Sequence, residues 1–244
     1  MSDENKNNPW GGEKDNNVID LRKKQKERED LEKKLEKELR KQNEPPIINL
    51  PPLTKYMLLV FASIFITTEF IVPTAYQEWA FMNLGFVPGR FTGNFPFNFL
   101  QFITPITHMM LHGSWLHLIM NSVMLLAFGS GIEKWLGSKN MLIIFVLSGL
   151  FGMGTHFVIY SSSIYPVVGA SGGLSGLFAA ALIMLQRQNM GMNGRYGIWP
   201  FIFLWIGISV IFGMMGGPDG STIAWAAHIG GFLGGFLALK LLKI

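Results

Sequence analysis

Residues 169–182 read G-A-S-G-G-L-S-G-L-F-A-A-A-L, a long apolar run with a serine at position 171 near its start. A second apolar run, residues 225–235, reads W-A-A-H-I-G-G-F-L-G-G and carries a lone histidine at position 228. Polar and ionisable side chains are unfavourable inside a bilayer, and where they occur they indicate a functional site. The pair therefore predicts chemistry performed within the membrane.

Six apolar segments come near the length of about 20 residues that a helix needs to span a bilayer. They are residues 56–72, 114–131, 141–160, 167–185, 198–215 and 222–242. We therefore predict an all-α polytopic membrane protein, a bundle of six transmembrane helices. Residues 75–102, rich in Phe, Asn, Gly and Pro, predict an outer loop that lies partly in the membrane interface.

Charge divides the chain into two regions. Residues 1–55 hold 13 of the 20 basic and 12 of the 16 acidic side chains. We predict a charged tail over residues 1–52 and a membrane domain over residues 53–244. In the tail, residues 1–17 have a composition typical of disorder, and residues 18–42 predict a solvated helix. Leucines on one face of that helix leave a short coiled coil or a membrane-surface helix open as alternatives.

The other basic residues predict the orientation in the membrane. If the tail is cytoplasmic, six bases fall on its side of the membrane and only Arg90 falls on the opposite side. The six are Lys134, Lys139, Arg187, Arg195, Lys240 and Lys243. By the positive-inside rule, both termini are expected in the cytoplasm. The polar N-terminus resembles neither a signal peptide nor a transit peptide, which favours a bacterial cytoplasmic (inner) membrane over an organellar one.

Composition also excludes several kinds of site. The chain has no cysteine, so it forms no disulfide, thiolate metal site or cysteine nucleophile. Its basic residues outside the tail are scattered between apolar runs, and no basic stripe indicates nucleic-acid binding. No third ligand accompanies the histidines that could hold a metal. We expect no metal, no other cofactor and no nucleic-acid partner.

Ser171 and His228 are predicted to lie at one depth. Counted from the outer ends of their segments, both fall about 6–9 Å below the membrane surface at 1.5 Å per residue. Small residues let transmembrane helices approach closely, and Gly172, Gly231 and Gly235 lie beside this pair. The imidazole would then act as general base toward the hydroxyl. Because no acid lies at this depth on either helix, we predict a dyad rather than a triad.

The second segment provides further polar groups. His117 and Asn121 are four residues apart and therefore share a helix face. Their donors, with the backbone N–H of Ser171, could stabilise the oxyanion of a tetrahedral intermediate. His112 is predicted closer to the surface, bracing the outer loop.

Four motifs in order resemble the rhomboid intramembrane serine proteases. They are the set His112, His117 and Asn121, then G-I-E-K-W-L-G at residues 131–137, G-A-S-G at 169–172, and A-H-x-x-G-x-x-x-G at 227–235. The match resembles the six-span bacterial form and covers residues 55–242. The resemblance implies cleavage of single-span membrane proteins near the outer surface of the bilayer. It makes Ser171 the nucleophile and His228 the base, with His117 and Asn121 at the oxyanion and Gly169, Gly172, Gly231 and Gly235 in support.

The chain departs from the family pattern beside the nucleophile. A second G-x-S-G at residues 173–176 makes Ser175 an alternative nucleophile, although Ser171 lies nearer the outer water. Relatives often place at position 175 a ring that stacks on the catalytic histidine. The orientation of His228 must therefore come from another residue. The bulky aromatic residues of segment 198–215 are interpreted as lipid-facing or packing residues.

Two functions of other classes remain as alternatives. A non-catalytic rhomboid-like binding protein would use the same glycine-rich packing, but it would need neither Ser171 nor His228. A small transporter would be expected to show paired broken helices or inverted repeats, which this sequence lacks.

Overall fold

The computed structural model describes residues 13–43, 49–188, 194–215 and 224–244. The chain divides into two compact units, Met1–Asn49 and Leu50–Ile244. In the first unit, α1 (Glu13–Asn43) confirms the predicted tail helix and begins five residues earlier than position 18. The helix therefore covers residues 13–17, where disorder was predicted. The rest of the stretch predicted to be disordered, residues 1–12, lies outside the described residues.

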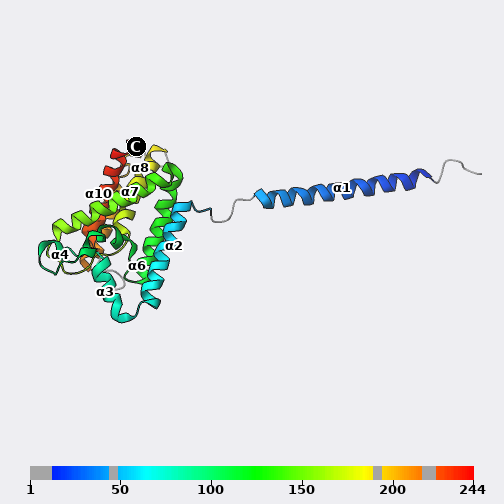
Figure 1. The fold of residues 1–244 in the computed structure, drawn as a ribbon. Helices are drawn as coiled ribbons and strands as arrows, with labels where there is room; N and C mark the ends of the chain where they lie inside the picture. Colours follow the sequence, from blue (N-terminus) through cyan, green and yellow to red (C-terminus); the bar gives the residue numbers. More distant parts are fainter. Residues whose placement is uncertain (1–12, 44–48, 189–193, 216–223) are drawn as a thin grey trace, which may run out of the picture. The chain divides into compact units, whose positions relative to one another are not determined.

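In the described part of the second unit, all named elements are helices, which confirms the all-α fold (Figure 1). Its long helices are α2 (Pro52–Ile66, continued by a π-helical turn, Thr67–Ile71), α6 (Trp115–Met124), α7 (Ser130–Ile159), α8 (Ser171–Arg187), α9 (Trp199–Met215) and α10 (Trp225–Leu241). A second π-helical turn, Leu125–Gly129, joins α6 to α7. Within the described ranges the only β-pairing is a single bridge between Phe86 and Val167.

Gly137 separates the second and third predicted segments. Its φ of 80° lies in the left-handed region, where glycine is favoured, so the helix axis breaks inside α7. By length and apolar composition, two helical stretches among the described residues are suited to cross a membrane, Pro52–Ile71 (20 residues) and Trp115–Ile159 (45 residues). Helices α8, α9 and α10 have 17 residues each, the short limit for a span. Six spans therefore remain a prediction.

The segment predicted as an outer loop is mostly helical. It contains α3 (Thr74–Leu84), α4 (Gly89–Thr92) and a 3-10 turn (Phe99–Phe102), and α5 (Thr104–Thr107) with a further turn (His108–Met110) follows. Its phenylalanines pack on one another. Ring centroids are 5.4 Å apart for Phe86 and Phe91 and 5.9 Å for Phe91 and Phe97. This aromatic packing gives the segment a small core of its own.

Helices α7, α8 and α10 pack on one another more extensively than any other helices of the fold. Glycines make this possible. A Cβ on Gly231 would overlap the backbone of Gly172, and a Cβ on Gly235 would overlap the backbone of Gly176. Close backbone approach through small residues is the usual way in which helices associate in lipid. The glycine spacing noticed in the sequence is therefore used at the contact between α8 and α10.

Glu133 ties the start of α2 to the start of α7. Its carboxylate accepts hydrogen bonds from the backbone N–H of Leu53 (2.8 Å) and Thr54 (2.7 Å), and from the hydroxyls of Thr54 (2.8 Å) and Ser138 (2.7 Å). The first N–H groups of a helix have no partner within the helix, so this carboxylate caps α2. The side chain is buried, at 4% exposure.

Replacing Glu133 with alanine is expected to lower the free energy of unfolding by about 3 kcal/mol, because it leaves two buried N–H groups and two hydroxyls without their charged acceptor. The measurement is reversible unfolding in mixed detergent micelles. Glu69, which is exposed, provides the matched control, and Glu69→Ala should change the free energy by less than about 0.5 kcal/mol. Equal effects of the two substitutions would contradict the assigned role of Glu133.

Candidate active site

The segment before α8 is held in place by backbone hydrogen bonds. Phe86 and Val167 exchange two of them, at 3.0 and 2.8 Å, and the N–H of Gly169 donates to the carbonyl of His108 at 2.8 Å. Gly169 itself has a φ of 114°, a conformation that glycine adopts without strain. The chain then turns into α8, whose first residue is Ser171.

Ser171 therefore lies at a helix end, not four residues inside a helix as the sequence predicted. The extended backbone through Gly169 delays the helix, because its positive φ is incompatible with a helical turn. Two consequences follow for chemistry. The side chain is only partly buried, and the N–H of Ser171 is among the first N–H groups of α8, which lack an intrahelical acceptor and carry the positive end of the helix dipole.

His228 is the fourth residue of α10, and α10 lies directly against the start of α8. A Cβ on Gly172 would be 3.5 Å from the carbonyl oxygen of Ala227, so the neighbours of Ser171 and His228 are in contact. Gly152 of α7 also packs against Ala227. Among the hydrogen bonds of the described residues, none joins Ser171 Oγ to the imidazole of His228. Catalytic hydrogen bonds are often long without substrate and shorten in the complex.

His117 lies beside the nucleophile segment. A Cβ on Gly169 would be 2.5 Å from His117 Nε2, so the imidazole occupies the space that the missing side chain leaves. His117 thus lies against the segment that leads into Ser171. Its role as an oxyanion donor stays a prediction.

A methyl group at Gly169 is expected to displace His117 and to slow reaction of Ser171 with a fluorophosphonate probe by about 100-fold, the effect of misplacing a catalytic group by roughly 1 Å. The measurement is the labelling rate of Gly169→Ala. Gly113, which has open space around it, provides the matched control, so Gly113→Ala should label at the parental rate. A Gly169→Ala protein that labels as fast as Gly113→Ala would show that the space is not needed.

Asn121 is buried at 2% exposure on α6, one turn from His117. Its Nδ2 donates to the carbonyl of His117 at 2.9 Å, which uses one of its two hydrogens. The second hydrogen remains for another acceptor. Its Oδ1 is buried and has no partner. The amide is thus fixed beside His117 with donor capacity left.

His112 differs from its predicted place near the surface. It is 1% exposed, because α2 packs over it through Phe61. Its ring lies 5.1 Å from that of Phe61 and 5.2 Å from that of His117, centroid to centroid. Neither ring nitrogen has a hydrogen-bond partner. The ring of His112 therefore packs against the ring of His117 and also contacts Phe61 of α2.

Ser175, the alternative nucleophile, is fully buried. Its hydroxyl donates a 2.7 Å hydrogen bond to the carbonyl of Ser171, one turn earlier. A serine that bonds its own helix backbone in the core has neither access to substrate nor a base beside it. This geometry favours Ser171 over Ser175.

The sequence analysis overlooked Trp205 as a neighbour of the site. Its ring lies 6.3 Å from that of His228, centroid to centroid, at an interplanar angle of 34°. It was assigned, with the other aromatic residues of its segment, to lipid contact or packing. Only the spacing of α9 and α10 in three dimensions reveals the contact, because the two residues lie far apart in the sequence.

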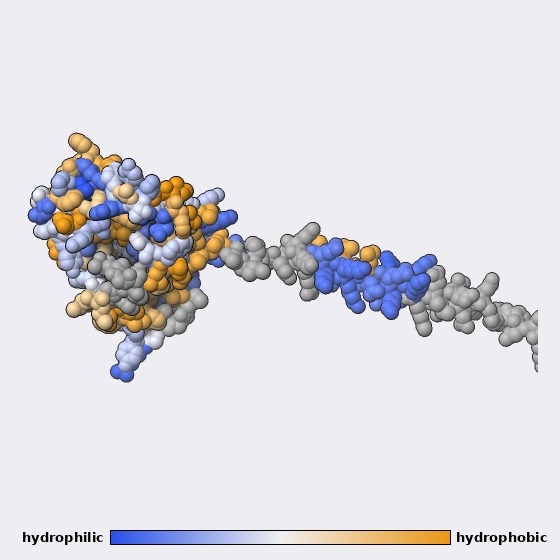
Figure 2. Space-filling view, turned by 90° about the horizontal axis from the view of Figure 1, so that it is seen from below, coloured by the Kyte–Doolittle hydropathy of each residue, from blue (hydrophilic) through white to orange (hydrophobic). Residues whose placement is uncertain are grey.

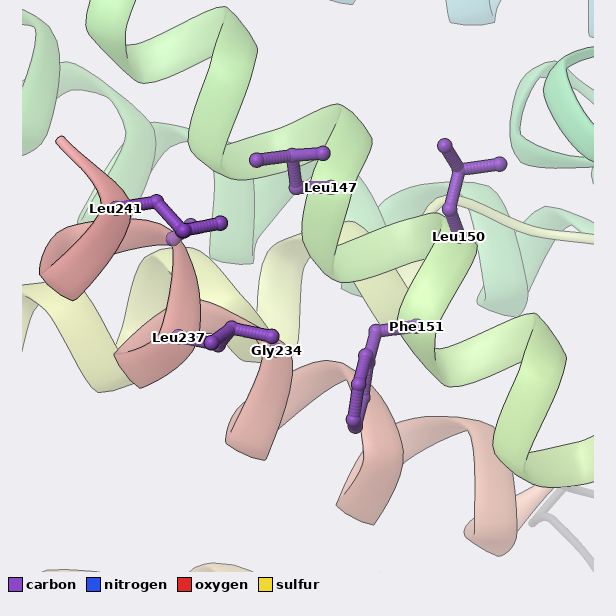
Figure 3. Close-up of a pocket in the computed structure, with 7 residues that line it drawn as sticks. Leu147, Leu150, Phe151, Gly234, Leu237 and Leu241 are labelled. Carbon is purple, nitrogen blue, oxygen red and sulfur yellow. The ribbon is translucent and has the colours of Figure 1, made fainter.

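A hollow of about 250 Å³ lies between α7 and α10 but away from these residues (Figure 3). Leu147, Leu150 and Phe151 of α7 face Leu237 and Leu241 of α10 across it. Its lining is apolar and contains none of the predicted site residues. The hollow is therefore not part of the candidate active site.

Comparison with known proteins places the chain among rhomboids. The Rhomboid domain model matches residues 100–243. The chain is 33% identical over 140 residues to rhomboid protease GluP of Bacillus subtilis (57% of this chain, 26% of GluP). It is 33% identical over 132 residues to RHOMBOID-like protein 6, mitochondrial, of Arabidopsis thaliana (54% and 40%), and 29% identical over 150 residues to rhomboid protease GlpG of Yersinia pestis (58% and 50%). The matched region therefore spans half or less of each of these relatives.

Proposed function

The chain belongs to the rhomboid family, since the matching domain covers more than half of its length, and from this we propose that it is an intramembrane serine endopeptidase. We further propose that Ser171 is its nucleophile and His228 its general base. The observation that carries the proposal is the contact of Gly172 with Ala227, because it brings the first turn of α8 against the first turn of α10.

In the first half of the reaction, Ser171 Oγ attacks the scissile carbonyl carbon while the imidazole of His228 accepts the hydroxyl proton. The tetrahedral intermediate collapses as the carbon–nitrogen bond breaks, and His228 returns the proton to the leaving amine. In the second half, water repeats the cycle on the acyl-enzyme and regenerates Ser171. No carboxylate takes part.

The negative oxygen of the intermediate needs donors that are already in place. The Ser171 N–H at the start of α8 is one candidate, since helix N-termini favour developing negative charge. His117 Nε2 and the second hydrogen of Asn121 Nδ2 are the others. Their positions on one face of α6, next to Gly169, support this assignment.

The substrates we propose are single-span membrane proteins, cut in or near the transmembrane segment. A protease acts on extended backbone, so segments with glycine, proline or small residues near their outer end should be cut best. We also propose that the chain spans a bacterial inner membrane six times with both termini in the cytoplasm. The distribution of basic residues supports that orientation, and the surface of α1 is largely hydrophilic (Figure 2).

The test is cleavage of a model single-span substrate by the purified protein in detergent and in liposomes. The proposal predicts two products whose junction lies in or near the transmembrane segment, and none with His228→Ala. Intact substrate in every lipid condition, together with stable co-purification of that substrate, would instead favour the non-catalytic binding protein.

A further inference from the structure

Trp205 is the ring that lies against His228. It comes from α9, and its other face meets Phe178 of α8, with ring centroids 5.0 Å apart. Phe178 in turn packs on Phe232 of α10 at 5.8 Å. Trp205 therefore contacts both α8 and α10. On α10, His228 and Phe232 are one helical turn apart. These distances are within the 4.5–7 Å range over which aromatic rings attract one another.

Among the described residues, no carboxylate is placed to hold the imidazole of His228. The described acids of the second unit are Glu69, Glu78 and Glu133. The carboxylate of Glu133 accepts hydrogen bonds from Leu53, Thr54 and Ser138, and the other two glutamates are exposed. Ser175, at the position next to this site on α8, turns its hydroxyl to its own backbone. In the described part of the chain, the aromatic ring that packs against the imidazole is that of Trp205.

The indole N–H adds a second observation. Trp205 Nε1 is buried and has no hydrogen-bond partner. A buried tryptophan usually pairs this N–H, because leaving it unpaired is unfavourable. The ring is thus kept at this position by its packing and not by a polar anchor.

We propose that Trp205 is a positioning residue of the catalytic base, which restricts the imidazole of His228 to orientations that can reach Ser171. The proposal rests on the proposed protease function. It implies that α9 must pack against α8 and α10 for His228 to act as the base. In this contact, Ile198, Ile202 and Trp205 pack against Ala179, Leu182 and Phe232.

The first test measures the labelling rate by a fluorophosphonate probe per folded molecule. Trp205→Ala is expected to react about tenfold more slowly than the parent, which corresponds to the upper end of the interaction energy of one aromatic pair. Trp205→Phe is expected to react within about threefold of the parental rate. Trp199 is the matched control on the same helix, since it is 60% exposed and stacks on Phe203. Trp199→Ala should label at the parental rate.

The second test follows tryptophan fluorescence against pH and needs no turnover. A protonated imidazole quenches an adjacent excited indole. The parent and Trp199→Phe should therefore show a fluorescence step as His228 titrates, and Trp205→Phe and His228→Ala should lack it. Trp199→Phe is the control because it also replaces one tryptophan of α9 by phenylalanine. If any such replacement removed the step by loosening the helix, Trp199→Phe would lose the step as well.

Parental labelling by Trp205→Ala, or equal loss in Trp205→Ala and Trp205→Phe, would overturn the role of the ring. A fluorescence step that persists in Trp205→Phe would overturn the contact with His228. Failure of the parent protein to label would instead count against the protease function, and the fluorescence test would still decide whether Trp205 and His228 are in contact.

Discussion

Replacing Ser171 with alanine is expected to abolish cleavage and fluorophosphonate labelling, a loss of at least about 10³-fold. Alanine removes the hydroxyl oxygen that we propose forms the acyl-enzyme. The hydroxyl of Ser175, one turn further along α8, is buried and bonded to the helix backbone. Both assays should be run on protein that unfolds at the parental temperature, so that the loss is assigned to chemistry.

Ser175→Ala is the matched control, one turn further along α8. It removes a hydroxyl that bonds the carbonyl of Ser171 in the core, and cleavage should remain within about an order of magnitude of the parent. Cleavage that survives Ser171→Ala but not Ser175→Ala would contradict the assignment of the nucleophile.

Replacing Gly231 with alanine is expected to destabilise the fold by roughly 3 kcal/mol and to remove activity with it. The added methyl group would overlap the backbone of Gly172, which cannot yield as a flexible side chain can. Helices α8 and α10 would have to separate, and Ser171 and His228 would separate with them.

The control for this substitution is Gly154→Ala on α7, where an added methyl group meets nothing within 4 Å. Alanine has the higher helix propensity, so that variant should be unchanged or more stable by up to about 1 kcal/mol. Unfolding in mixed detergent micelles gives both values. Similar stabilities for the two variants would show that close packing at Gly231 is not required.

Much of this arrangement could be predicted from the sequence because it depends on local chemistry. Apolar runs and small residues predicted the helices and the close contact of α8 with α10. The spacing of His117 and Asn121 predicted a shared face, which α6 provides. Charge patterning predicted the tail helix.

Other features depend on three-dimensional contacts that no local pattern encodes. Ser171 lies at a helix end because hydrogen bonds to Phe86 and His108, distant in sequence, hold the preceding segment extended. His112 is buried because α2 packs over it through Phe61. The contact of Trp205 with His228 arises from the seating of α9, and an apolar helix of uniform character does not indicate which of its faces is inward.

The central claim is that Ser171 becomes nucleophilic through His228. The direct measurement is mass-spectrometric mapping of the fluorophosphonate adduct on the intact protein. The account predicts a single adduct on Ser171 in the parent protein and none in His228→Ala at the same probe concentration. An adduct on another residue, or one on Ser171 that forms equally fast without His228, would contradict it.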